Sequence, residues 1–155
     1  MESPIRPAVA ADRGPVQDIV DAAYAPWAEL IGIRPLPMEA DYGALIAAGR
    51  VFVTGAPAAL IVLVPEDGAL LVENVAVAPA AQGRGLGRRL LAFAEERARA
   101  LGLPSLRLYT NALMTSNIAL YERLGYRETR RDDIGGRHVV HMAKQLPPPH
   151  DRVVG

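Results

Sequence analysis

The segment Val75–Leu91, VAVAPAAQGRGLGRRLL, constrains the fold more than any other part of this sequence. Its first residues form an apolar, alternating run, which predicts a strand. Its last residues begin an amphipathic pattern that continues to Leu101 and predicts a helix. Three glycines, at positions 83, 85 and 87, separate the two patterns. The segment therefore predicts a strand that turns sharply into a helix, with little side chain to cover the main chain at the turn.

A turn of this kind can bind an anion. The first N–H groups of a helix have no partner within the helix, and the helix dipole adds partial positive charge. Arg84, Arg88 and Arg89 would add full charges, and phosphate is the anion that suits such a site best. About 100° of helix rotation separates Arg88 from Arg89, so we expect at least one of them to face solvent and not all three arginines to be ligands. The alternative is a tight connection that closes the strand onto its helix, and the segment by itself leaves both interpretations open.

Two nucleotide-binding motifs are excluded at this turn. The dinucleotide fingerprint G-x-G-x-x-G would need glycine where the chain has Arg88. The P-loop ending G-K-[ST] does not occur in the chain. The turn instead reads Q-x-x-G-x-G from Gln82 to Gly87.

The rest of the sequence alternates between strand and helix patterns. The predicted strands are Ile5–Val9, Val51–Thr54, Leu60–Pro65, Leu70–Val77, Leu106–Thr110, Tyr126–Arg131 and His138–Lys144. The predicted helices run from Asp12 to about Ala23, over Tyr42–Ala48, over Leu86–Leu101 and over Ser116–Leu124. Between Tyr24 and Gly49 the pattern is otherwise irregular. We expect a single domain over residues 1–146, followed by a flexible tail at residues 147–155.

Composition excludes several classes of function. Lys and Arg together number 17, as do Asp and Glu, so no net field attracts nucleic acid or an acidic membrane. There is no cysteine, which removes thiolate metal sites and a cysteine nucleophile. His138 and His141 lie on opposite faces of a predicted strand, and we expect no metal site. No apolar run approaches the roughly 18 residues of a membrane span, and no signal peptide is visible, which predicts a soluble, cytoplasmic protein.

Two segments together resemble the GNAT family of N-acetyltransferases. The Q-x-x-G-x-G turn, after an apolar strand and before an amphipathic helix, is similar to the loop with which that family binds the pyrophosphate of acyl-CoA. Downstream, Met114–Glu128 reads MTSNIALYERLGYRE, and its matching positions are Asn117, Ala119, Tyr121, Gly125 and Tyr126. The spacing from Asn117 to Tyr121 is shorter than the form commonest in the family. The resemblance is strongest from about Glu73 to Glu128.

The resemblance implies a fold and a cofactor. The fold is α/β (α+β), a single GNAT domain with a mixed, mostly antiparallel, twisted sheet of about seven strands and helices on both faces. Its central strands, Leu70–Val77 and Leu106–Thr110, would run parallel and splay apart, and the pantetheine of acetyl-CoA would enter the gap. The implied cofactor-binding residues are Val75, Ala76, Val77, Gln82, Gly83, Arg84, Gly85, Leu86, Gly87, Arg88, Asn117 and Tyr121.

The implied reaction is the transfer of acetyl from acetyl-CoA to a primary amine by direct attack in a ternary complex. Such a reaction needs no enzyme nucleophile, but the amine must lose a proton first. Glu73 is the candidate base, because it interrupts an apolar strand two residues before Val75, on the face that alternation gives to both. The alternative is an outward polar residue on a half-exposed strand. Some members of the family place their glutamate two residues earlier, where this chain has Leu71.

Tyr121 is the candidate acid. A phenol stays protonated at neutral pH and can donate to the leaving thiolate. The family places this tyrosine next to the sulfur, although packing of the short helix on the sheet is the other role open to it. Tyr126 is expected to be a core residue without chemistry.

The irregular segment Tyr24–Gly49 is the candidate acceptor side. Its candidate substrate-binding residues are Tyr24, Trp27, Met38 and Tyr42. The segment would form either a proline-stiffened lid over the acceptor or a loop that docks its aromatic residues onto the core. The acceptor amine, of a small molecule or a peptide, stays unidentified, as do the acyl-chain preference and the oligomeric state, although dimers are common in the family. The alternative function is a non-catalytic acyl-CoA sensor or interaction module on the same fold.

Overall fold

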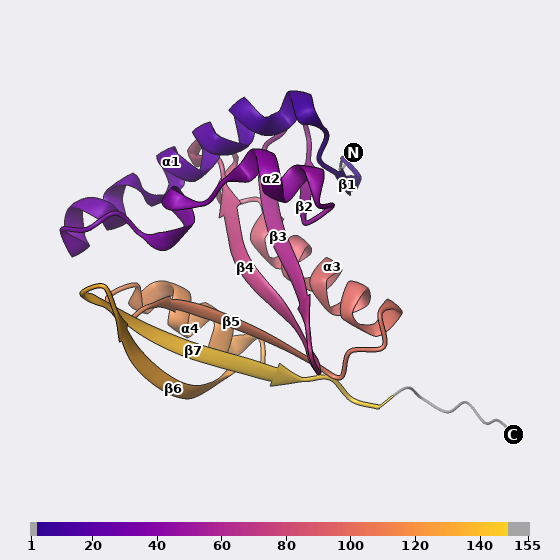
Figure 1. Ribbon diagram of the computed structural model, residues 1–155, viewed down its shortest axis with the longest axis vertical. Helices are drawn as coiled ribbons and strands as arrows, with labels where there is room; N and C mark the ends of the chain where they lie inside the picture. The colour runs from indigo at the N-terminus through magenta and orange to yellow at the C-terminus, as the bar shows by residue number, and fades with distance from the viewer. Residues whose placement is uncertain (1–2, 149–155) are drawn as a thin grey trace, which may run out of the picture.

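The computed structural model describes residues 3–148, which build around a seven-stranded sheet (Figure 1). The strand order is β1-β2-β3-β4-β5-β7-β6. The strands are β1 Ile5–Pro7, β2 Val51–Thr54, β3 Ala59–Glu66, β4 Ala69–Val77, β5 Ser105–Asn111, β6 Arg127–Ile134 and β7 Arg137–Gln145. Neighbouring strands are antiparallel except β4 and β5, which are parallel.

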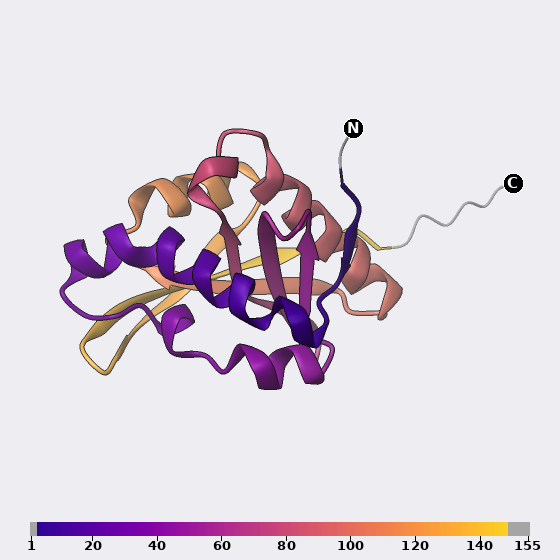
Figure 2. The same cartoon turned by 90° about the horizontal axis from the view of Figure 1, so that it is seen from above.

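Helices cover both faces of the sheet (Figure 2). The helices are α1 Arg13–Ile31, α2 Tyr42–Ala47, α3 Leu86–Ala100 and α4 Thr115–Arg123, with short 3-10 segments η1 Ala10–Asp12, η2 Leu36–Glu39 and η3 Pro79–Ala81. One buried cluster joins α1 and α2 to the sheet, and another joins α3 and α4 to the opposite face. These observations confirm the predicted class, the seven strands, the helices on both faces and the parallel central pair.

The parallel pair separates soon after it begins. Pairing between β4 and β5 is limited to three positions, which run from Leu70 opposite Leu106 to Val72 opposite Leu108. Beyond Val72, β4 continues to Val77 beside β3 alone, while β5 continues beside β7. Figure 1 shows the two strands diverging from their point of contact. A gap therefore opens at the centre of the sheet, toward the carboxyl ends of both strands.

A β-bulge at Glu73 changes which residues of β4 face which helices. Leu63 of β3 pairs with Val72, but the preceding residue, Val62, pairs with Asn74, so Glu73 is the extra residue. Val72 and Val75 pack on the α3 side, whereas Ala76 packs on the α1 side. Simple alternation predicted one face for Glu73 and Val75, and the bulge breaks that alternation. The register shift was not visible in the sequence, because a bulge adds no distinctive residue type.

Helix α1 is longer than the sequence predicted. It was expected to end near Ala23, with an irregular segment from Tyr24 onward, but it continues to Ile31 and ends at Gly32, whose φ is 83°. Pro26 lies inside the helix, although proline removes a helical hydrogen bond. Ala23 and Tyr24 pack against the cluster shared with α2, and we attribute the extra turns to this burial.

The other elements agree with the predicted bounds within about two residues, except that β6 ends three residues later than predicted. Residues 149–155 of the predicted tail lie outside the described residues, and residues 147–148 adopt no regular structure. None of the helices in residues 3–148 has both the length and the apolar character to cross a membrane.

Candidate active site

Two clefts meet at the gap between β4 and β5. The central cleft lies over the gap and is bounded by β4, β5, η2 and the start of β7. The loop cleft runs from the gap toward the glycine turn before α3. The residues that line both clefts are Tyr24, Val75, Met114, Asn117 and Tyr121. Any molecule that occupies both clefts must therefore pass these five side chains.

The loop cleft gathers many of the predicted cofactor-binding residues. Those that line it are Val75, Ala76, Val77, Gln82, Gly87, Asn117 and Tyr121. The side chain of Gln82 donates a hydrogen bond of 3.3 Å to the carbonyl oxygen of Val77, which ties the turn to the end of β4. Residues 82 and 77 come from the two sides of η3. Residues of both motif regions of the sequence thus line one cleft.

The glycine turn combines left-handed main-chain angles with N–H groups that are not used by any other group of the described residues. Gly83 and Gly85 adopt left-handed φ angles of 84° and 76°, which residues other than glycine rarely adopt. The first main-chain bond of α3 is donated by Arg89 to the carbonyl of Gly85, at 3.0 Å. Within residues 3–148, the N–H groups of Gly83 through Arg88 donate to no acceptor. Several donors are thus available to a ligand at the turn.

The three arginines after Gln82 take different positions. Arg84 and Arg88 are exposed, and Arg84 borders a hollow that also includes Leu86. Arg89 instead donates to Thr54 Oγ1 at 3.3 Å and to the carbonyl of Ser3. It therefore joins α3 to the N-terminal segment and β2. Arg84, Leu86 and Arg88 do not line the loop cleft itself.

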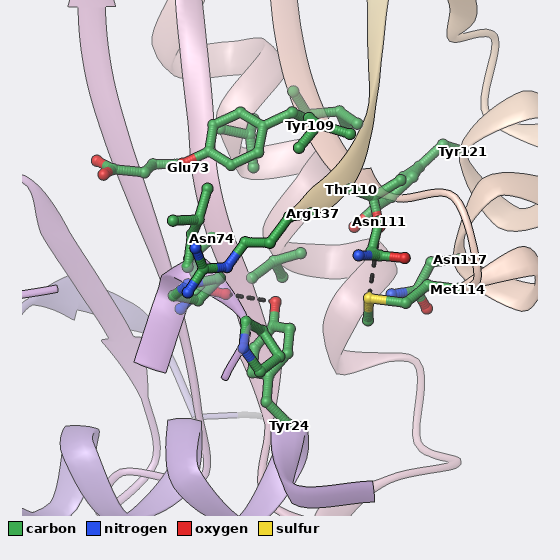
Figure 3. Close-up of a pocket in the computed structure, with 17 residues that line it drawn as sticks. Tyr24, Glu73, Asn74, Tyr109, Thr110, Asn111, Met114, Asn117, Tyr121 and Arg137 are labelled. Carbon is green, nitrogen blue, oxygen red and sulfur yellow. Dashed lines mark hydrogen bonds between the residues drawn. The ribbon is translucent and has the colours of Figure 1, made fainter. Parts of the chain in front are cut away.

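Tyr121 projects from α4 into the junction of the two clefts (Figure 3). Its residue is 8% exposed, and burial raises the pKa of its phenol to about 12. Among the described residues its hydroxyl has no hydrogen-bond partner. The phenol is therefore protonated at neutral pH and is available to donate a hydrogen bond to a ligand.

Glu73 lines the central cleft, and its carboxylate forms no hydrogen bond or ion pair with residues 3–148. Burial, followed by the nearby charge of Glu66, raises the pKa of its carboxyl. Figure 3 shows the carboxylate pointing away from Tyr121. The two candidate catalytic groups thus share the central cleft but do not point toward one another. A proton relay between the junction and Glu73 requires an intervening water or another rotamer of this side chain.

The candidate substrate-binding residues divide between the clefts and the core. Tyr24 lines both clefts, and Trp27 lines the loop cleft. Tyr42 is 2% exposed and packs in the core beside Met38, so the structure brings neither to a cleft. Pro35, Leu36 and Pro37 line the central cleft in their place. The loop therefore does both things that the sequence left open: it docks an aromatic residue and it forms a cleft wall.

Asn74 is a residue that the sequence analysis did not select. It is 5% exposed, and its side chain accepts a hydrogen bond of 2.7 Å from the hydroxyl of Tyr24. Its amide nitrogen donates to the hydroxyl of Tyr42 at 2.9 Å, and Tyr42 donates to the carbonyl of Pro37. An asparagine within an apolar strand was the available signal, but alternation alone gave it no partner.

Arg137 was also missed. It lines the central cleft from the start of β7, and its Nε and Nη2 donate to the carbonyl of Arg34, at 3.0 and 2.8 Å. Its Nη2 also lies 3.8 Å from Oε1 of Glu39. The guanidinium thereby fastens the β6–β7 turn to the segment between α1 and η2, across the cleft. No sequence pattern links positions 34 and 137, because the contact depends on the completed fold.

The chain is similar to known proteins in sequence and in fold. The profile of the family described as "Acetyltransferase (GNAT) family" matches residues 16–126. A mycothiol acetyltransferase from Thermomonospora curvata is 38% identical over 76 residues, which is 49% of this chain and 23% of that enzyme. The chain thus spans less than a quarter of the length of this curated relative.

Solved structures share the fold across most of the chain. The PaiA N-acetyltransferase from Thermoplasma acidophilum, in complex with coenzyme A, superposes with a TM-score of 0.75 at 16% identity over 94% of this chain and all of that one. The ribosomal-protein-S18-alanine N-acetyltransferase from Escherichia coli has a TM-score of 0.72 at 24% identity, with all of both chains covered. At these identities the likeness concerns the fold.

Proposed function

Because the chain belongs to the acetyltransferase (GNAT) family, we propose that it is an N-acetyltransferase that moves acetyl from acetyl-CoA to a primary amine. The observation that carries the proposal is the set of unused N–H donors at Gly83 through Arg88, in a turn whose Gly87 lines the cleft that leads to Tyr121. The first feature suits a diphosphate and the second suits a leaving thiolate. We place the reaction in the cytoplasm, as the sequence led us to expect.

The cofactor is proposed to follow the loop cleft. The pyrophosphate would accept hydrogen bonds from the N–H groups of the glycine turn, with Arg84 and Arg88 supplying charge from its exposed side. The pantetheine would run along Val75–Val77, where β4 has no neighbour on the side of β5. The thioester would then lie at the junction, beside Asn117 and Tyr121. The complex of the PaiA enzyme with coenzyme A supports this donor by analogy of fold.

The chemistry is a direct displacement at the acetyl carbonyl. An alkyl ammonium has a pKa of about 10.4, so supplying the neutral amine at pH 7 costs roughly 5 kcal/mol. Glu73 would take this proton through water, given the direction of its carboxylate. The amine nitrogen bonds to the carbonyl carbon, the carbon–sulfur bond breaks, and Tyr121 gives a proton to the departing thiolate. The nitrogen, now part of the amide, releases its second proton through water to the Tyr121 phenolate, which restores the phenol. The proton on Glu73 returns to solvent.

The acceptor is proposed to enter through the central cleft, whose wall includes Pro35–Pro37. Acetyltransferases of similar fold or sequence are named for different molecules, one for mycothiol and one for the alanine of a ribosomal protein. Both a small molecule and a peptide are therefore within the proposed class.

A non-catalytic acyl-CoA sensor is the second candidate, and the direction of the Glu73 carboxylate favours it. A sensor needs the glycine turn but neither proton carrier. The two candidates therefore differ in turnover and agree in binding.

The experiment combines thermal unfolding with thiol release. Millimolar acetyl-CoA should raise the melting temperature, because a ligand that binds only the folded state stabilises it. Thiol release is then followed with spermidine, L-methionine, kanamycin and an alanine-initiated peptide. Stabilisation with amine-dependent thiol release supports the enzyme. Stabilisation without thiol release across the panel supports the sensor, and the absence of any stabilisation contradicts both.

A further inference from the structure

A chain of three hydrogen bonds runs through the wall of the central cleft. Tyr24 of α1 bonds to Asn74 of β4 at 2.7 Å, and Asn74 bonds to Tyr42 of α2 at 2.9 Å. Tyr42 then bonds to the carbonyl of Pro37 in η2. Asn74 and Tyr42 are buried, while Tyr24 is half-buried and reaches the junction of the two clefts. The chain thus connects the carbonyl of Pro37, a partly buried residue of the cleft wall, to the place where the reacting groups meet.

The carbonyl at the inner end fixes the direction of every bond in the chain. A carbonyl oxygen can only accept, so the single hydroxyl proton of Tyr42 goes to Pro37. The oxygen of Tyr42 must then accept from Asn74, which assigns the amide nitrogen to that side. The amide oxygen of Asn74 consequently faces Tyr24 and takes its proton. A reversal of the links would take the donor away from the partly buried carbonyl of Pro37.

The outer end of the chain therefore has a single polarity. With its proton committed to Asn74, the hydroxyl oxygen of Tyr24 can offer only lone pairs to the cleft. Burial also raises the pKa of Tyr24, so the phenol stays neutral and does not act as a base. Figure 3 shows the Tyr24 hydroxyl directed at Asn74, beside the cleft that also holds Tyr121. A hydroxyl in water can donate or accept a hydrogen bond, whereas the Tyr24 hydroxyl can only accept one from a ligand in the cleft.

We infer that the Tyr24 oxygen binds an N–H of the acceptor amine and so positions the attacking nitrogen, with Asn74 and Tyr42 as the positioning residues that fix its direction. This inference rests on the proposed function. It identifies the acceptor as a molecule whose attacking atom carries a strong hydrogen donor, as primary and secondary amines do and as thiols and tertiary amines do not.

The test is a double-mutant cycle of Tyr24→Phe and Tyr42→Phe. Its readout is the KM for whichever of the four amines under Proposed function is acetylated fastest. Tyr24→Phe should raise KM for the amine by about threefold to tenfold, the worth of one hydrogen bond, and leave the Kd for acetyl-CoA unchanged. Tyr42→Phe should raise KM by a smaller factor, although Tyr42 lines neither cleft. The double variant should be no worse than Tyr24→Phe, because Tyr42 acts only through Tyr24. Tyr126→Phe, which removes another buried hydroxyl, is the matched control and should leave KM unchanged.

Two results would overturn the inference. One is an unchanged KM in Tyr24→Phe, and the other is a double variant whose loss is the product of the single losses. If Tyr42→Phe does not fold, Asn74→Leu provides the same comparison, because it removes the amide oxygen and leaves both tyrosines in place. If the wild type turns over no amine, the proposed function fails. Calorimetric binding of spermidine to the wild type and to Tyr24→Phe, both with coenzyme A bound, then decides the inference: equal affinities contradict it and weaker binding by the variant supports it.

Discussion

The rings of Tyr121 and Tyr126 meet edge to face, with centroids 5.9 Å apart and an angle of 62° between their planes. Both tyrosines are almost fully buried, at 8% and 2% exposure. Tyr121 lines the two clefts, whereas Tyr126 lines neither, and the Tyr126 hydroxyl has no partner among the described residues. We therefore expect that removal of the Tyr121 hydroxyl lowers activity, whereas removal of the Tyr126 hydroxyl stabilises the folded protein.

Tyr121→Phe should lower kcat by about a hundredfold, within the range measured for general acids, and leave the Kd for acetyl-CoA within about twofold. The pKa of Tyr121 is raised to about 12, so the wild type should lose no activity through this group between pH 6 and pH 10. Stopped-assay rates and calorimetric affinities check the two quantities separately. An unchanged kcat would remove Tyr121 from the mechanism.

Tyr126→Phe should raise the free energy of unfolding by about 1 kcal/mol, because it removes a buried polar atom that has no hydrogen bond. Urea unfolding of the variant and the wild type measures the difference. Activity serves as the control, since this ring faces the core. A destabilised variant would show that the hydroxyl has a partner in solution.

Gly87→Ala should separate folding from binding. A methyl group at position 87 would lie 3.9 Å from Cγ2 of Val77, an ordinary contact, and alanine favours a helix over glycine by up to about 1 kcal/mol. Stability should therefore stay equal or rise, while acetyl-CoA affinity falls about tenfold because the methyl group covers main chain that the ligand approaches. Thermal unfolding and calorimetry measure the two effects. Gly14→Ala, at another helical position with free space around it, is the matched control. Equal losses of affinity in both variants would argue against a ligand at the turn.

Glu73→Gln should lower activity and raise stability at neutral pH. Burial raises the pKa of Glu73 above its unfolded value of about 4.3, so the unfolded chain loses this proton first as pH rises. The wild type then loses stability over the window that begins near the unfolded value and ends above the folded one. The variant should melt higher than the wild type at pH 7, and the difference should vanish below about pH 4. A constant difference across that range would contradict the assignment.

Asp12→Asn should destabilise the protein by about 1 to 2 kcal/mol at pH 7. Asp12 is buried and accepts two hydrogen bonds from Arg6, at 2.8 and 3.2 Å, and one from the N–H of Val9 at 2.8 Å. These hydrogen bonds lower the pKa of the Asp12 carboxyl, and those from Arg6 have the largest effect. The stabilisation is therefore present above the unfolded pKa of about 3.9 and is lost as pH falls below it. Unfolding at pH 7 and pH 3 should show a large and then a small difference from the wild type.

Local patterns predicted most of the fold. Alternation and turn residues located β2 through β5 closely, and the apolar stripe located α3 between Leu86 and Ala100. Gln82, Gly87 and Tyr121 line one cleft, and the roles that the resemblance implies for them stay predictions. These features depend on residues near one another in the chain, and such spacing can be read directly.

The features that the sequence did not reveal depend on distant contacts. The last turns of α1 follow from burial of Tyr24, and the bulge at Glu73 follows from register with β3. The hydrogen bond from Tyr24 to Asn74 joins residues 50 positions apart, and the contact of Arg137 with Arg34 spans 103 positions. The sequence shows that Glu73 is a polar residue in an apolar strand. The direction of its side chain, however, depends on the register between β4 and β3.

Because β4 and β5 diverge early, part of each strand lies inside the sheet without the other as a hydrogen-bonding neighbour. Such unpaired strand segments are otherwise typical of the outer edges of a sheet. A ligand that supplies the absent hydrogen bonds would serve as an additional strand as well as a substrate. Binding of such a ligand and folding would then be linked equilibria. The resistance of the protein to unfolding and proteolysis would rise with the concentration of that ligand.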